Sequence, residues 1–192
     1  MKLNAEIHIN ATREQVYAAL NNPDILQRSI PGCERIERIS ETELKATVVA
    51  KIGPIKAKFK GQVTLSDLNP PESYTISGEG NGGGAGFAKG GAKVFLKDNG
   101  VATVLRYEVQ AEVGGKLAQL GSRLIDGAAR KLAGEFFNSL QEIVSVRVEK
   151  EEVSNGSDVK EGINVRAFHP LVLFSFGVMS LAALYILIKS FC

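Results

Sequence analysis

Apolar and polar residues alternate along much of the first 113 residues, with the two-residue period of half-buried β-strands. Two short helices interrupt this pattern after the first strand: Thr12 caps one, and the other ends before Pro31. The sequence Asp98-Asn99-Gly100 predicts a tight hairpin turn. The alternation is clearest over residues 2–9, 43–52, 55–65, 72–80 and 101–113.

A different period begins at Lys116, where apolar residues recur every three or four positions to about Val146, as in a long amphipathic helix. The predicted order is a strand, two short helices, about six antiparallel strands and one long helix. A curved sheet wrapped around the long helix buries both apolar faces. Residues 1–148 are therefore predicted to form one α+β domain. The helical stripe comprises Leu117, Leu120, Leu124, Ala128, Leu132, Phe136, Leu140 and Val144.

Residues 78–91 read GEGNGGGAGFAKGG, and eight of these fourteen residues are glycine. A phosphate-binding loop requires a helix directly behind the glycines, but a strand and a hairpin turn follow here. The stretch is instead predicted to be a sharply bent hairpin, which either turns a barrel corner or leaves space for a cavity. Gly121, Gly127 and Gly134 are expected inside the long helix, where each costs about 1 kcal/mol relative to alanine. They permit either close packing on the sheet or a thin pocket wall.

The C-terminal part of the chain has another composition. Residues 149–169 are charged and aperiodic, which predicts a flexible linker. Residues 171–188 carry no charge, and at ~1.5 Å per residue they would span roughly 27 Å, close to the ~30 Å of a bilayer core. We therefore expect residues 170–189 to form a transmembrane tail anchor in the cell membrane. Because no secretory signal precedes the domain, the domain is expected to face the cytoplasm.

Composition restricts the chemistry. A net charge of +2 argues against a nucleic-acid binder with a broad basic face. Two cysteines and two histidines cannot complete a usual metal site, and no pair of side chains has acid–base or nucleophile spacing. We therefore expect no metal, no cofactor and no enzymatic activity. Three alternating lysines, Lys56, Lys58 and Lys60, share one strand face; they either deter strand pairing or attract anionic lipid headgroups.

Two segments resemble a known family. GGKLAQLGSRLIDGAARKLAGEFF (residues 114–137) and GFAKGGAKVFL (residues 86–96) are similar to the CoxG family of carbon monoxide dehydrogenase subunits. The order of elements over about residues 1–147 resembles the START-like, Bet v 1-like helix-grip superfamily. The resemblance implies a hydrophobic cavity between sheet and helix and an accessory role beside a molybdenum hydroxylase of the carbon monoxide dehydrogenase type. Linking that enzyme to the membrane, or carrying a membrane quinone to it, follows from the resemblance alone.

The expected cavity holds an apolar molecule, a quinone or a lipid. Phe59 and Tyr107 occupy inward-facing strand positions, whereas glycines make the orientation of Phe87 and Phe95 uncertain. Two other functions stay open: a recruitment adaptor whose cavity is vestigial, and a START-like enzyme acting on a hydrophobic substrate. The residues predicted to line or gate the cavity are Phe59, Phe87, Phe95, Tyr107, Leu117, Leu120 and Leu124.

Overall fold

A computed structural model describes residues 1–155 of the chain, which fall in one compact unit, Met1–Gly156. Seven strands, three α-helices and two 3₁₀ helices (η) make up this unit. In chain order they are β1 (Lys2–Ile9), α1 (Arg13–Leu20), α2 (Pro23–Ser29), β2 (Cys33–Arg38), β3 (Glu43–Ile52), β4 (Ile55–Asn69), β5 (Ser73–Asn81), η1 (Gly83–Ala85), β6 (Phe87–Asn99), β7 (Ala102–Gly114), η2 (Gly115–Leu120) and α3 (Ser122–Asn155).

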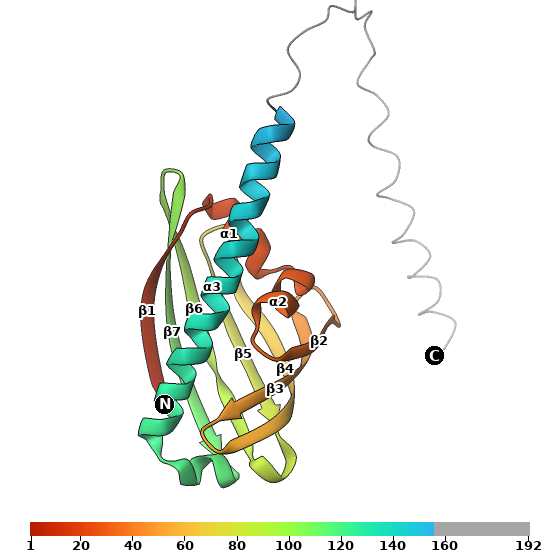
Figure 1. Cartoon of the computed structure of the whole chain (residues 1–192), viewed down its shortest axis with the longest axis vertical. Helices are drawn as coiled ribbons and strands as arrows, with labels where there is room; N and C mark the ends of the chain where they lie inside the picture. The colour runs from red at the N-terminus through yellow and green to blue at the C-terminus, as the bar shows by residue number, and fades with distance from the viewer. Residues whose placement is uncertain (156–192) are drawn as a thin grey trace, which may run out of the picture. The chain divides into compact units, whose positions relative to one another are not determined.

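The strands form a single curved antiparallel sheet in the order β1-β7-β6-β5-β4-β3-β2. The long helix α3 runs across one face of this sheet, which we call the inner face, and α1 and α2 lie beside it (Figure 1). The predicted arrangement of sheet and long helix is confirmed. The glycine-rich stretch is also a hairpin, as predicted, because β5 and β6 pair from Ser73↔Phe95 to Asn81↔Phe87.

The two short helices follow from their caps. The Thr12 side chain accepts from the backbone N–H of Gln15, while the Gln15 side chain accepts from the Thr12 N–H, which completes a capping box. The Asn22 side chain caps α2, and Pro23 occupies its first turn, where the missing N–H has no consequence. These caps fix α1 and α2 directly after the first strand.

The sheet has two distinct ends. The turns at 70–72 and 100–101 lie at one end of the sheet, which we call the packed end. The turns at 53–54 and 82–86 lie at the other end, which we call the open end. The fully buried core lies toward the packed end, where α1, α2 and the second half of α3 meet the inner face. Its members are Leu3, Ile9, Ala11, Val16, Ala19, Leu20, Ile25, Leu65, Tyr74, Val94, Leu96, Leu105, Tyr107, Leu140 and Val144.

The long helix differs from its prediction at both ends. It begins at Ser122, because Gly121 adopts φ +82° and separates it from the short helix η2. Gly121 is therefore not inside a helix, and of the three glycines only Gly127 and Gly134 are. At its other end α3 continues to Asn155, into the segment predicted to be a linker.

Within residues 1–155 no helix is both long enough and apolar enough to cross a membrane. The predicted span, residues 170–189, lies outside the described residues.

Candidate functional site

Small residues occupy the inner face of the sheet at the open end. The register aligns Ala46 with Gly61, Gly61 with Gly80, and Gly80 with Ala88 across four neighbouring strands. No side chain in this row is larger than a methyl group. A Cβ atom built at Gly80 would have no other atom within 4 Å, so the space above it is unfilled. The row therefore leaves room above the inner face of the sheet.

Apolar side chains border this small-residue row without filling it. Phe59 and its cross-strand partner Val48 face inward, yet both are only half-buried and neither joins the buried core. The Phe59 ring reaches toward the β5–β6 turn, since a Cβ at Gly82 would lie 2.5 Å from it. Leu117 on η2 is fully buried at this end. The open end is thus apolar but loosely packed, unlike the packed end.

A side groove of about 620 Å³ lies between the end of β3 and the first half of α3. The loop at Pro31-Gly32 and the turn residue Gly53 complete its walls. Leu124 is 39% exposed in the groove and touches the turn, because a Cβ at Gly53 would lie 2.8 Å from its Cδ2. The helix contributes Leu124, Gly127, Ala128, Lys131, Leu132 and Glu135.

Tyr107, like Tyr74, is a buried tyrosine of the core on the inner face. Its ring stacks on Phe137 of α3, with centroids 5.3 Å apart. Burial raises the pKa of the Tyr107 hydroxyl, and the positive charge of Arg130 opposes part of that rise. The hydroxyl is therefore protonated at neutral pH, and it makes no hydrogen bond with any residue in the part of the chain that the structure describes. It remains available as a donor.

Asp126 is a second polar group on the covered side of α3. It lies seven residues before Ala133 and fourteen before Leu140, so helical spacing places it on the face that packs against the sheet. Its Oδ1 atom is buried and has no hydrogen-bond partner within residues 1–155. An unpaired buried carboxylate oxygen is rare and calls for a functional or structural explanation.

The seven residues predicted to line a cavity lie in different parts of the domain: Tyr107 belongs to the buried core toward the packed end, whereas Phe59 lies at the open end. Phe59 and Tyr107 face inward from the sheet, and Leu117 and Leu120 lie on η2 at the open end. Leu124 lies on α3 in the side groove. The prediction for Phe87 and Phe95 requires correction. β6 keeps an unbroken register, so both rings lie on the outer face with Lys89 and Lys93 and are 39% and 42% exposed.

The sequence interpretation did not single out the aromatic pair Phe136 and Phe137 as part of the site. Their rings contact each other edge to face at 4.9 Å, and both are half-buried against the core. Phe136 belongs to the helical stripe that the sequence predicts. The two adjacent aromatic residues, Phe136 and Phe137, are visible in the sequence and could have predicted a wider aromatic wall on α3. The aligned small residues were not identified either, because cross-strand register cannot be read from composition.

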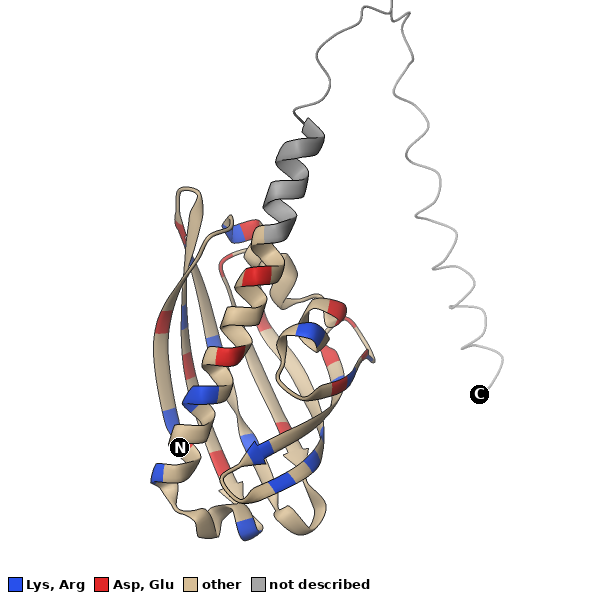
Figure 2. Cartoon of the chain, in the orientation of Figure 1, with Lys and Arg blue, Asp and Glu red and all other residues tan. Residues whose placement is uncertain are grey.

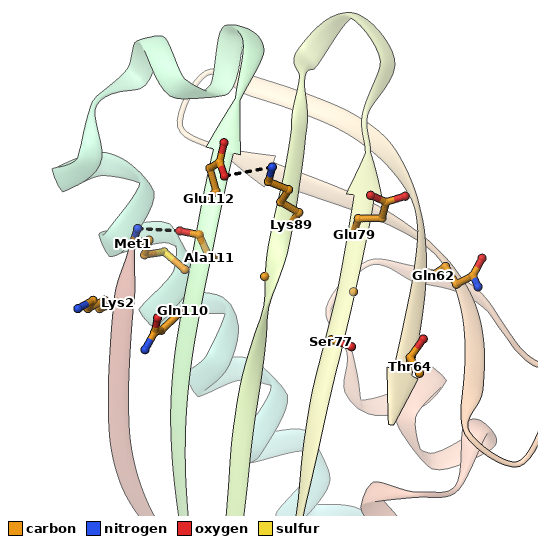
Figure 3. A pocket seen from close by; sticks show the side chains of 12 residues that line it. Met1, Lys2, Gln62, Thr64, Ser77, Glu79, Lys89, Gln110, Ala111 and Glu112 are labelled. Carbon is orange, nitrogen blue, oxygen red and sulfur yellow. Dashed lines mark hydrogen bonds and ion pairs between the residues drawn. The ribbon is translucent and has the colours of Figure 1, made fainter. Parts of the chain in front are cut away.

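The outer face carries a hollow of a different kind. It has a volume of about 830 Å³ and lies over β4–β7 and β1 (Figure 3). Its side chains are mostly polar; Lys89 pairs with Glu112 at 3.2 Å, and the Met1 amino group donates to the Ala111 carbonyl at 2.7 Å. Polar walls with internally paired charges do not favour an apolar ligand. Within the described residues, no group of His, Cys, Asp and Glu could hold a metal ion.

Comparison with known families gives one decisive result. The sequence model of CoxG, a subunit of carbon monoxide dehydrogenase, matches residues 5–145. The chain belongs to the CoxG family. A conserved protein from Geobacillus kaustophilus is 34% identical and superposes with a TM-score of 0.72, covering 76% of this chain and 95% of its own. No curated protein matches the chain.

More distant structures share the fold of this CoxG chain. A START superfamily protein from Mycobacterium smegmatis is 12% identical, with a TM-score of 0.59 and coverage of 75% of this chain and 97% of its own. The ZhuI aromatase/cyclase from Streptomyces sp. R1128 is 10% identical, with a TM-score of 0.54 and coverage of 77% and 95%. At such identities the likeness shows the START-like fold alone. CoxG membership and this fold together indicate an accessory role that includes binding a hydrophobic ligand.

Proposed function

We propose that the chain binds a membrane quinone in the space between the sheet and α3 at the open end. One observation carries this proposal: the inner-face row Ala46, Gly61, Gly80 and Ala88 is unfilled above Gly80, although apolar side chains surround it. Small residues at this position make room that a larger side chain would close. The side groove beside Leu124 opens at the same end of the sheet.

The chemistry of the open end suits a quinone. An isoprenoid chain gains about 25 cal/mol for each Å² of apolar surface it buries, so tight binding needs no charged anchor. Phe59 and Leu117 supply apolar surface at this end, whereas Tyr107 belongs to the buried core and pairs with Val94, six residues along β6 from Ala88.

The family suggests the setting of this function. CoxG is an accessory component, and we propose that the partner is a molybdenum hydroxylase of the carbon monoxide dehydrogenase type. We propose further that residues 170–189 anchor the chain in the cell membrane, with the domain in the cytoplasm. The full chain should then resist carbonate extraction from membranes, and a chain lacking residues 170–189 should not. Release of the full chain by carbonate would overturn the anchor.

Ligand binding can be tested with tryptophan, which the sequence lacks. Phe59→Trp places a single indole on the inner face, and Phe95→Trp places one on the outer face as the matched control. Quinones quench nearby indole fluorescence. Titration of the full chain in mild detergent with a short-chain ubiquinone or menaquinone analogue should quench Trp at 59 saturably and Trp at 95 only by collision.

Three outcomes separate the candidate functions. Saturable quenching at 59 supports the carrier, and mass spectrometry of organic extracts then identifies the bound molecule. Equal, unsaturable quenching at both positions would reject the carrier and favour the recruitment adaptor. The adaptor is tested by measuring whether the full chain binds the dehydrogenase with no quinone present. Turnover of a hydrophobic substrate by the isolated chain would favour the START-like enzyme.

A further inference from the structure

The β3–β4 hairpin projects from the sheet at the open end. β2 pairs with β3 only as far as Val48, and β5 pairs with β4 only from Lys60 onward. Residues 49–59 therefore form a two-stranded ribbon that has few neighbours. Gly53 adopts φ +57° at the turn, followed by the exposed Pro54. We call residues 51–60 the basic tip.

Lysines concentrate on the outer face of the basic tip. Lys51 and Lys56 are direct cross-strand partners, and Lys58 and Lys60 continue the same face of β4. All four are exposed, and Figure 2 shows the blue patches where β3 and β4 approach their turn. Like charges directly opposite each other in a hairpin are destabilising. The pair Lys51–Lys56 therefore works against folding and needs another explanation.

The tip also lacks compensating acid. Lys58 pairs with Glu34 at 2.8 Å, but Lys51, Lys56 and Lys60 form no ion pair within residues 1–155. Elsewhere on the outer face, Lys89 pairs with Glu112, whereas Lys93 and Lys97 form no ion pair within residues 1–155. At the tip, three unpaired lysines lie together on one face of a hairpin, and this cluster complements a surface that presents many negative charges at once.

Apolar residues lie at the end of the same ribbon. Ile52 and Ile55 pair across the turn and are only half-buried, and Pro54 is exposed between them. The exposed Leu124 lies against Gly53. An apolar end flanked by lysines matches a bilayer surface, where anionic headgroups lie above the hydrocarbon.

We propose that the basic tip docks on an anionic lipid surface. Each lysine near such a surface adds about fivefold to the partition coefficient, so Lys51 and Lys56 together contribute roughly 25-fold. Lys51 and Gly53 also line the side groove, so docking would bring the mouth of that groove to the bilayer. That last consequence rests on the proposed ligand function, whereas docking itself does not.

The test follows the environment of the tip in the full chain. Both cysteines are replaced by serine, and Pro54→Cys carries a polarity-sensitive dye. Vesicles of phosphatidylcholine with about 30% phosphatidylglycerol should shift the dye emission to the blue, and phosphatidylcholine alone should not. Added salt should reverse the shift, because it screens the charges. The matched control is Val101→Cys at the packed end, where Val101 is 89% exposed and no shift is expected.

Two charge variants complete the test. Lys51→Gln with Lys56→Gln should lower the docked-to-free ratio by roughly 25-fold. Lys93→Gln with Lys97→Gln removes the same charge from the outer face of β6 and should leave the ratio within about twofold, since exposed charges more than about 10 Å away are screened. If the first variant docks as the parent does, or if the parent shifts equally in phosphatidylcholine, the proposal is wrong, and the lysines then serve to block strand pairing. A blue shift at position 54 without quinone quenching at position 59 would uphold docking and reject the ligand.

Discussion

Filling the unfilled space at Gly80 is the sharpest test of a cavity. Gly80 lies on the inner face of β5, its φ is not in the left-handed region, and an added Cβ would have no atom within 4 Å. Gly80→Leu should therefore fit without strain and occupy the room that a ligand would use. The change is expected to affect ligand binding and folding stability in opposite directions.

The magnitudes follow from two terms. Replacing a strand glycine lowers the entropy of the unfolded chain and gains roughly 0.5–1 kcal/mol. Partial burial of the leucine side chain adds a similar amount, below the ~1.5–3 kcal/mol of full burial. A net gain of about 1 kcal/mol corresponds to a rise of ~2–4 °C in Tm for a domain of this size. Displacing on the order of 100 Å² of ligand contact costs ~2.5 kcal/mol, so binding should weaken by roughly 50- to 100-fold.

The assay combines thermal unfolding by circular dichroism with quinone quenching of Trp at position 59. Gly134→Leu is the control, since Gly134 is a glycine of α3 whose added Cβ also meets nothing. It should raise Tm through helix propensity and leave binding unchanged. If Gly80→Leu instead lowers stability by about 1–3 kcal/mol, the space is already filled and the reasoning is wrong. Unchanged binding would place the ligand elsewhere.

Three other substitutions probe buried polar groups. Asp126→Leu removes a buried carboxylate oxygen that has no partner among the described residues and should stabilise the fold by about 1 kcal/mol in thermal unfolding; a lower Tm would reveal a hidden partner. Burial, with a smaller contribution from Tyr17, raises the pKa of the Tyr74 hydroxyl above its usual 10.0. As pH rises, the hydroxyl therefore loses its proton in the unfolded chain before it does so in the folded chain. The free energy of unfolding should then fall as pH rises above about 10. Tyr74→Phe should flatten that fall in urea titrations between about pH 8 and 11; an unchanged slope would refute the assignment. Thr103→Val breaks the 2.7 Å bond from Oγ1 to the Ala11 carbonyl and should lose about 1–2 kcal/mol in urea unfolding; a loss below about 0.3 kcal/mol would show that water replaces the bond.

The fold could be predicted from local patterns because each element has its own signal. Strand alternation, the Thr12 cap and the three-to-four residue stripe of α3 are visible in short windows, and the structure contains all of them. The start of α3 could not be placed in this way. Gly121 interrupts a stripe that continues on both sides, and only its positive φ separates η2 from the helix.

The site was harder to predict, since it depends on how strands align. The unfilled row needs Gly61, Gly80 and Ala88 side by side, and that register is set by hairpin turns rather than by composition. The error at Phe87 and Phe95 has a related cause. Val94 and Leu96 face inward, so strict alternation along β6 places the rings of Phe87 and Phe95 on the outer face. Alternation extends back to Phe87 only if the glycines at 90 and 91 introduce no bulge, which the sequence does not show.

Confining the tightly packed core to one end of the sheet has a consequence for motion. Backbone amides near Leu105 and Val94 are enclosed by the core and should exchange with deuterium only when the whole domain unfolds. Amides of the β3–β4 ribbon, with few neighbours on either side, can exchange through local opening at far lower free energy. The open end can therefore undergo local opening and closing many times while the rest of the domain stays folded.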